Sequence, residues 1–243
     1  MRDVLLPAAI VVGAAMISGS IIWSADFRVQ PAPSFGGATN ATMPDPASVP
    51  IVPLVDITKV KLAGEPFVGE PTAKAVMAFW YDYQCPFCRQ IEQNVLPQLI
   101  ADYVDTGKLR IYFKDYAFLG PDSQNAALAG RAVWEVAPKA YYAWHSAVFA
   151  HQDGENRGWG SPDDLAAVTR SLPAIDSTAV TMALGRNAAT YQQAIAADLA
   201  EGEAAGIQGT PGAIIGDQLI SGAEPYAVFK AAVDRALAAS ATP

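Results

Sequence analysis

The hydrophobic pattern of residues 75–116 predicts a strand, a helix and a second strand. Residues 75–81 form an uncharged apolar and aromatic run, which is typical of a strand buried on both faces. Helical spacing extends over residues 86–103, where Pro97 is expected to kink or break the helix. Residues 109–116 carry the aromatic and β-branched side chains of another strand. A helix between two strands predicts that the strands are parallel.

The middle of the chain is rich in alanine and predicts a block of helices. A loop over residues 118–123 leads into four predicted helices, at residues 125–136, 141–150, 163–170 and 178–205. Two short strands and a last helix follow, at residues 213–215, 218–221 and 225–239, and Gly216-Asp217 is expected to form the hairpin turn. The pattern predicts one α/β domain over residues 54–240, with a helical insertion at about residues 118–205.

The N-terminal residues do not fit this domain. The uncharged apolar run from Val4 to Trp23 is long enough to cross a bilayer, so residues 1–23 are predicted to be a transmembrane anchor. A cleaved signal peptide is the alternative, although no Ala-x-Ala site follows closely. Residues 24–53 are rich in proline and predict a linker. Either N-terminus places the domain outside the cytoplasm, where disulfides persist.

Composition supports a folded domain and argues against nucleic-acid binding. Hydrophobic residues make up 51% of the 243-residue chain, enough for a substantial core. Acidic residues number 24 and basic residues 16, so the net charge is -8. A protein that binds nucleic acid needs the opposite balance on its contact surface.

The only cysteines, Cys85 and Cys88, lie close together at the start of the first predicted helix. A zinc site needs a full set of nitrogen or sulfur ligands, and besides this pair the chain offers only His145 and His151. A disulfide that closes so small a ring restricts the unfolded chain little, so it would be a poor staple. The pair is therefore predicted to carry redox chemistry, with no metal and no cofactor.

Helix position distinguishes the two thiols. Cys85 is expected at the helix N-terminus, where free backbone N–H groups favour a thiolate and lower its pKa, with its sulfur exposed. Pro86 fits the first turn, where a missing N–H costs nothing. Cys88 lies one turn further in, so it is expected to be shielded and to react only with Cys85 or with a disulfide on Cys85.

Three motifs together carry a family resemblance over about residues 55–240. They are Asp82-Tyr83-Gln84-Cys85-Pro86-Phe87-Cys88, Phe118-Leu119-Gly120-Pro121-Asp122-Ser123 and Gly206-Ile207-Gln208-Gly209-Thr210-Pro211. In these the chain resembles the DsbA-like family of thioredoxin-fold thiol-disulfide oxidoreductases. The resemblance implies a thioredoxin fold with a helical insertion, and disulfide transfer to proteins in the bacterial periplasm. It also implies a cis peptide bond at Thr210-Pro211, with the backbone of Thr210 pairing with the incoming peptide.

The chain departs from this family at two positions. Phe87 stands where the strongest oxidants carry histidine, so a less extreme pKa of Cys85 is expected. Phe79 stands where relatives commonly place a buried carboxylate that helps move the proton of the second cysteine. Asp82 is the nearest substitute for that carboxylate, and a solvated turn residue is the alternative interpretation.

Several other residues are predicted to be structural. The helical block is expected to bury aromatic residues and both histidines in its core, namely Trp134, Tyr141, Tyr142, Trp144, Phe149, Trp159, His145 and His151. Ser123, beside Asp122, is expected to cap a helix.

The predicted protein is an inner-membrane-tethered monomer that faces the periplasm and donates its Cys85–Cys88 disulfide to cysteine-containing proteins. The transfer passes through a mixed disulfide on Cys85, and the resemblance implies that a membrane quinone-linked thiol oxidase regenerates the pair. If a signal peptide is cleaved, the enzyme is instead soluble in the periplasm. A reductase or isomerase is the alternative within the class, although no N-terminal dimerisation domain is evident. A peptide-binding or chaperone module is the alternative outside it, and the intact cysteine pair argues against it.

Overall fold

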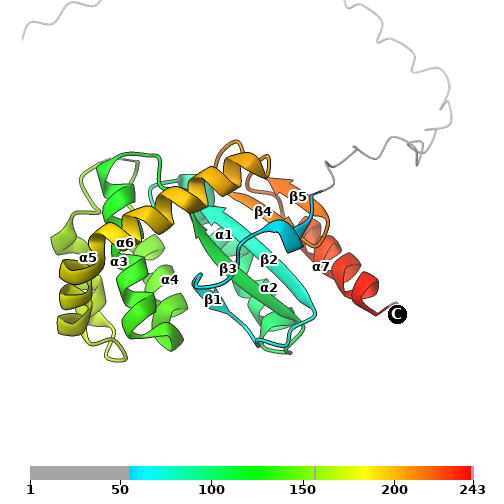
Figure 1. Cartoon of the computed structure of the whole chain (residues 1–243), viewed down its shortest axis with the longest axis horizontal. Coiled ribbons are helices and arrows are strands. Elements are labelled where there is room, and N and C mark those ends of the chain that lie inside the picture. The colour runs from blue at the N-terminus through cyan, green and yellow to red at the C-terminus, as the bar shows by residue number, and fades with distance from the viewer. Residues whose placement is uncertain (1–54, 156, 242–243) are drawn as a thin grey trace, which may run out of the picture. The chain divides into compact units, whose positions relative to one another are not determined.

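The computed structural model describes residues 55–155 and 157–241, which build a five-stranded sheet with helices on both faces (Figure 1). The strand order is β1-β3-β2-β4-β5. The strands are β1 (Phe67–Val68), β2 (Ala75–Tyr81), β3 (Leu109–Asp115), β4 (Gly212–Ile215) and β5 (Gln218–Ser221). β2 and β3 are parallel, as predicted, and the other neighbouring pairs are antiparallel. β1 was not predicted, because a two-residue edge strand is too short to show a period.

The helix that follows the cysteine pair is broken, as Pro97 predicts. α1 (Pro86–Asn94) ends just before α2 (Leu96–Leu99), and a π-helical turn over Ile100–Val104 leads on toward β3. A proline has no backbone N–H to continue the hydrogen bonds of α1, but it fits the first turn of a new helix. Pro97 takes that first-turn position in α2.

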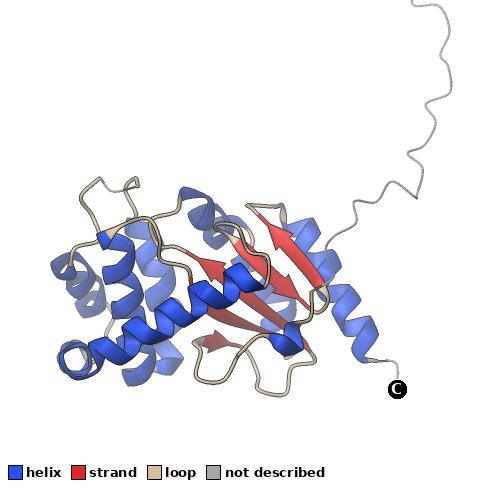
Figure 2. Cartoon of the chain, turned by 45° about the horizontal axis from the view of Figure 1, so that its top comes forward, coloured by secondary structure: helices blue, strands red, loops and turns tan. Residues whose placement is uncertain are grey.

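Four long helices form the insertion between β3 and β4, and they gather beside the sheet (Figure 2). They are α3 (Pro121–Val136), α4 (Tyr141–His151), α5 (Pro162–Ser171) and α6 (Ser177–Ala204). α3 begins earlier than predicted, because Pro121 starts the helix directly after Gly120, whose φ is 104°. Ser123 therefore lies inside the first turn, and the prediction that it caps the helix was wrong.

The last turns of α6 lie against the sheet. Trp80 of β2 donates its indole N–H to the carbonyl of Asp198 at 2.9 Å. A Cβ at Gly202 would lie 2.8 Å from the indole nitrogen of Trp80, so only glycine lets α6 approach this closely. On the opposite face of the sheet, α7 (Tyr226–Ser240) buries Phe229 and Val233 in the same core cluster as Cys88 of α1. The sheet is thus covered on both faces.

None of the helices in residues 55–155 and 157–241 is both long enough and apolar enough to cross a membrane. The predicted anchor, residues 1–23, and the predicted linker, residues 24–53, lie outside the described residues.

Candidate active site

Cys85 occupies the N-cap of α1, directly beyond the buried strand β2. Its backbone is extended, with φ −76° and ψ 119°, and Pro86 follows in the first helical turn. Cys88 lies in that same turn, and neither cysteine is in a disulfide. The two thiols therefore sit together at the end of a helix where unpaired N–H groups stabilise negative charge.

A loop from the far end of the chain reaches the cysteine pair. The Thr210–Pro211 peptide bond in this loop is cis, and the thiol of Cys85 donates to the carbonyl of Thr210 with a sulfur–oxygen distance of 3.3 Å. β4 starts at Gly212 and pairs with β2, so the sheet holds the loop beside the start of α1. The loop and β5 border a cleft of about 270 Å³ lined by residues 207–212, 221 and 222.

The two thiols differ strongly in acidity. The hydrogen bond from the Cys88 thiol lowers the pKa of Cys85 most, and burial acts in the opposite direction. Further donors, the side chain of Thr210 and the backbone N–H groups of Cys88 and Phe87, also lower this pKa. The net effect lowers the pKa of Cys85 from 9.0 to about 6. Burial raises the pKa of Cys88 well above its ordinary value. At neutral pH the site therefore holds a thiolate on Cys85 beside a neutral thiol on Cys88.

Cys85 is less exposed than predicted. Only 4% of the residue is exposed and Cys88 is fully buried, whereas Phe87 between them is 55% exposed. The carbonyl of Thr210 lies in hydrogen-bond contact with the Cys85 sulfur, which explains the low exposure. The shielding of Cys88 agrees with the prediction, and the expected exposure of the Cys85 sulfur was wrong.

Asp82 is buried, and its interpretation as a solvated turn residue was wrong. Its carboxylate accepts hydrogen bonds from the backbone N–H groups of Gln84, Phe118 and Leu119 and from the hydroxyl of Ser123. Burial raises its pKa, while these four hydrogen bonds act in the opposite direction. Asp82 thus ties the cysteine motif to the start of the insertion.

At the carboxylate position expected from relatives, Phe79 is 1% exposed and stacks on Tyr81 with 5.8 Å between ring centroids.

Gln152, directly after α4, holds the cysteine loop and was missed by the sequence analysis. Its side-chain amide donates to the carbonyl of Tyr83 at 2.6 Å and to the carbonyl of Cys85 at 3.1 Å. Its own carbonyl accepts from the guanidinium of Arg89 on α1 at 2.8 Å. A lone glutamine in a Gly-rich stretch, 67 residues from Cys85, gives no sequence signal of such a contact.

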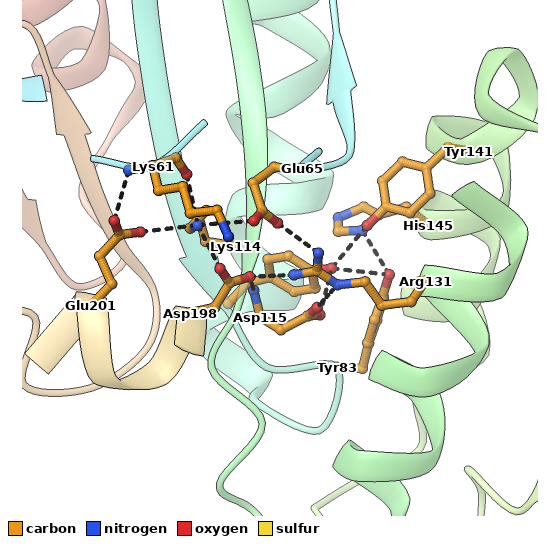
Figure 3. Close-up of polar contacts among 11 residues, drawn as sticks. Lys61, Glu65, Tyr83, Lys114, Asp115, Arg131, Tyr141, His145, Asp198 and Glu201 are labelled. Carbon is orange, nitrogen blue, oxygen red and sulfur yellow. Dashed lines mark hydrogen bonds and ion pairs between the residues drawn. The ribbon is translucent and has the colours of Figure 1, made fainter. Parts of the chain in front are cut away.

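A buried ionic cluster links the insertion to the sheet, and the sequence analysis missed it too (Figure 3). Arg131 of α3 pairs with Glu65 and Asp115, each at 2.6 Å, and with Asp198 of α6. Lys114 of β3 pairs with Asp198 at 2.5 Å. These side chains come from distant parts of the chain, so no local pattern predicts their meeting.

The helical block buries most of the residues assigned to its core. Tyr141, Trp144, Phe149 and His145 are fully or almost fully buried, and Trp134, Tyr142 and Trp159 pack partly buried against the same core. His151 is exposed, so its prediction as a core residue was wrong. It is the last residue of α4, and its ring nitrogen Nδ1 contacts the carbonyl of Ala147 at 2.8 Å. Within the described ranges, no three His, Cys, Asp or Glu side chains converge on a metal position.

Comparison with known proteins agrees with this geometry. Residues 61–235 match a family model described as Thioredoxin. Disulfide bond formation protein D of Bacillus subtilis (strain 168) is 25% identical over 176 residues, which cover 72% of this chain and 78% of that protein.

Solved structures share the fold. Oxidised BdbD from Bacillus subtilis covers 77% of this chain and 97% of its own, with a TM-score of 0.67 and 24% identity. The match to the thiol-disulfide exchange protein alpha-DsbA2 from Wolbachia pipientis covers 71% of this chain and 87% of that protein, with a TM-score of 0.63 and 25% identity. The chain therefore belongs to the thioredoxin family and is a DsbA-like thiol-disulfide oxidoreductase.

Proposed function

We propose that this protein is an oxidase, which donates a Cys85–Cys88 disulfide to thiols of proteins outside the cytoplasm. A client thiolate attacks the sulfur of Cys85, Cys88 leaves, and a mixed disulfide forms on Cys85. A second client thiol then attacks the client's sulfur in that bond, so that the client leaves oxidised and the enzyme is left with two thiols. The observation that carries the proposal is the contrast between the thiols, with the pKa of Cys85 at about 6 and that of Cys88 raised.

The thiolate explains the direction of transfer. A stabilised thiolate on Cys85 favours the reduced enzyme, and a protein whose reduced form is favoured readily gives its disulfide away. The side chain of Phe87, 55% exposed, offers apolar contact to a client peptide beside the pair, and Phe118, whose backbone N–H binds Asp82, is 51% exposed. The backbone of Thr210 would pair with that peptide once the contact with the Cys85 thiol is released.

The setting of the enzyme is also proposed. Residues 1–23 would anchor it in the bacterial inner membrane and residues 24–53 would serve as its tether, with the domain facing the periplasm as a monomer. A membrane quinone-linked thiol oxidase would then reoxidise it at high local concentration. Fractionation with N-terminal sequencing tests the anchor: a soluble periplasmic protein that begins near Ile21 or later would contradict it.

Trapping tests the roles of the two cysteines. The Cys88→Ala variant should accumulate mixed disulfides with client proteins, because Cys88 is no longer there to attack them, and the Cys85→Ala variant should accumulate none. The reverse pattern would overturn the assignment.

Equilibration of the wild type with glutathione gives the direction of electron flow. A potential well above that of thioredoxin, about −270 mV, supports an oxidase, and a value near it supports a reductase.

A further inference from the structure

The outer side of β5 is an open edge of the sheet within the part of the chain that the structure describes. β5 is the last strand in the order β1-β3-β2-β4-β5, and Figure 1 shows it on the side of the sheet away from β1. Because a two-residue turn joins β4 to β5, the backbone N–H and C=O groups of Leu219 and Ser221 point away from β4. None of residues 55–155 and 157–241 forms a backbone hydrogen bond with these groups. Such an edge can pair with one more strand.

Val55, the first described residue, lies beside this edge. Its backbone N–H donates to the carbonyl of Asp217 at 3.2 Å. Two residues later, the N–H of Ile57 donates to the carbonyl of Gly216 at 3.0 Å. The chain runs forward from Val55 while its partners run backward, so the two segments are antiparallel. Traced back from Val55, the chain therefore points along the open edge of β5, toward Ser221.

The residues that precede Val55 have the composition of a buried strand. Residues 51–54 are Ile-Val-Pro-Leu and carry no polar side chain, whereas residues 24–50 mix proline with glycine, serine, threonine, asparagine and charged residues. A continuous apolar run is typical of a strand that is covered on both faces. Residues 51–54 therefore differ from the rest of the linker in the way that pairing with β5 requires.

The register of such a pairing follows from the hydrogen bond of Val55. Partners in an antiparallel pair move in opposite directions along the chain, so Pro53 would lie opposite Leu219 and Ile51 opposite Ser221. Pro53 has no N–H, but its carbonyl can accept from Leu219, and the carbonyl of Leu219 stays with water, which an edge position allows. Ile51 can both donate to and accept from Ser221.

The side chains at this edge are incompletely covered. Val55 and Leu219 are only partly buried, and both pack against the core cluster that contains Trp80. In the register above, Ile51 and Pro53 fall on the same face of the sheet as these two residues. An apolar hollow of about 430 Å³ also opens beside Val55. The apolar residues of its lining are Val55, Val60, Ala204, Ala205 and Ile214.

We propose that residues 51–54 dock on β5 as a sixth, antiparallel strand of the sheet. The covalent link to Val55 holds this segment at the edge, so its effective concentration there exceeds that of a second molecule. Its apolar side chains would cover both faces of the edge, and its backbone would pair with the open groups of β5. The folded domain then begins near residue 50.

The docked strand would also border the client cleft. Ser221 and Gly222, at the end of β5, line the cleft beside the cis peptide bond. Pro50 and Ile51 would lie next to that end of β5 and extend this wall of the cleft. The name client cleft rests on the proposed function, whereas the docking of residues 51–54 does not.

Hydrogen exchange of the full chain in detergent micelles tests the docking. The amides of Leu219 and Ser221, read by fragmentation mass spectrometry, should exchange slowly in the wild type. The combined variant Ile51→Gly/Val52→Gly/Leu54→Gly should speed their exchange roughly tenfold or more, because the edge is then open to water. Equal exchange in the wild type and this variant would overturn the proposal.

A matched variant serves as the control. Val29→Gly/Phe35→Gly/Met43→Gly removes three large apolar side chains elsewhere in the linker and should leave the exchange of β5 unchanged. Protection that grows with protein concentration and survives the changes at residues 51–54 would assign the edge to a second copy of the chain, and would also overturn the proposal.

A disulfide trap tests the register. In a Cys85→Ala/Cys88→Ala background, Ile51→Cys should cross-link rapidly with Ser221→Cys, because opposite residues have Cα atoms about 5.5 Å apart, within the reach of a disulfide. Ser48→Cys with Ser221→Cys is the control and should cross-link at least about tenfold more slowly. Equal rates, or a faster control, would overturn the proposal. The native thiols take no part in either test, so failure of the docking is distinguishable from failure of the proposed function.

Discussion

The low pKa of Cys85 makes the stability of the reduced protein depend on pH. The thiol has a pKa of about 6 in the folded protein and of about 8.5 in an unfolded chain. A lowered folded pKa adds stability that is complete above the unfolded value and is lost as pH falls through the folded value. The gain therefore builds up between about pH 6 and pH 8.5.

The size of the effect follows from the two pKa values. The thiolate of Cys85 adds less than ~0.1 kcal/mol to the free energy of unfolding at pH 5, about 1.4 at pH 7 and about 2 at pH 7.5. Cys88 hardly contributes over this range, since its raised folded pKa keeps it neutral and the unfolded thiol is still mostly protonated. At pH 7 the gain corresponds to ~3–5 °C in Tm for a domain of this size.

Urea unfolding of the reduced protein at pH 5 and pH 7.5 measures this gain. Cys85→Ser is the control, because it keeps every other titrating group and lacks the thiolate. The difference in the free energy of unfolding between the wild type and this variant should rise by about 2 kcal/mol from pH 5 to pH 7.5. A change in that difference of less than ~0.5 kcal/mol would refute the reasoning, since the thiolate would then lack the stabilising contacts inferred from α1 and the Thr210 loop.

Three substitutions test residues close to the cysteine pair. Phe87→His should add a donor beside the thiolate, lower the pKa of Cys85 below about 6 and raise the redox potential; thiolate absorbance during a pH titration checks this, and an unchanged or higher pKa would contradict it. Asp82→Asn should lower the free energy of unfolding by about 1–3 kcal/mol, because an amide N–H₂ would face buried donors at Phe118 and Leu119. Ser123→Ala, which removes a single donor, should cost less in the same urea assay, and equal losses would argue against this account.

Local chemistry made much of the fold predictable. The uncharged run of β2, the proline break near Pro97 and the Cys85-Pro86 helix start each depend on a few neighbouring residues. The direction of the pKa shift of Cys85 was also predictable from the helix N-terminus, although the hydrogen bond from the Cys88 thiol contributes most and the backbone N–H groups of Cys88 and Phe87 add less. The start of α3 was predicted too late, because Pro121 fits both a loop and the first turn of a helix.

The surroundings of the cysteines could not be predicted in the same way. The contact of Gln152 with Cys85 joins residues 67 apart, and the contact of Asp82 with Ser123 joins residues 41 apart. Only the tertiary fold brings such distant groups together. The sequence alone suggests no contact, because a polar side chain in a loop is ordinarily solvated.

The insertion supplies several of the polar contacts around the cysteine motif. Ser123 in the first turn of α3 and Phe118 just before it donate to Asp82, helix α4 brings His145 to Glu92, and Gln152 just beyond α4 holds the carbonyl of Cys85. These contacts require the helical block to sit at one fixed place on the sheet.

The buried ionic cluster can enforce that placement. Arg131 of α3 meets Asp115 of β3 and Asp198 of α6, and each charge is compensated only when all three elements are in register. Buried ion pairs contribute little net stability, yet breaking one leaves an uncompensated charge that costs about 3–5 kcal/mol. A shifted insertion would therefore lose the cluster and the active-site contacts together. The buried ionic cluster thus favours the one placement of the insertion in which its residues contact the cysteine motif.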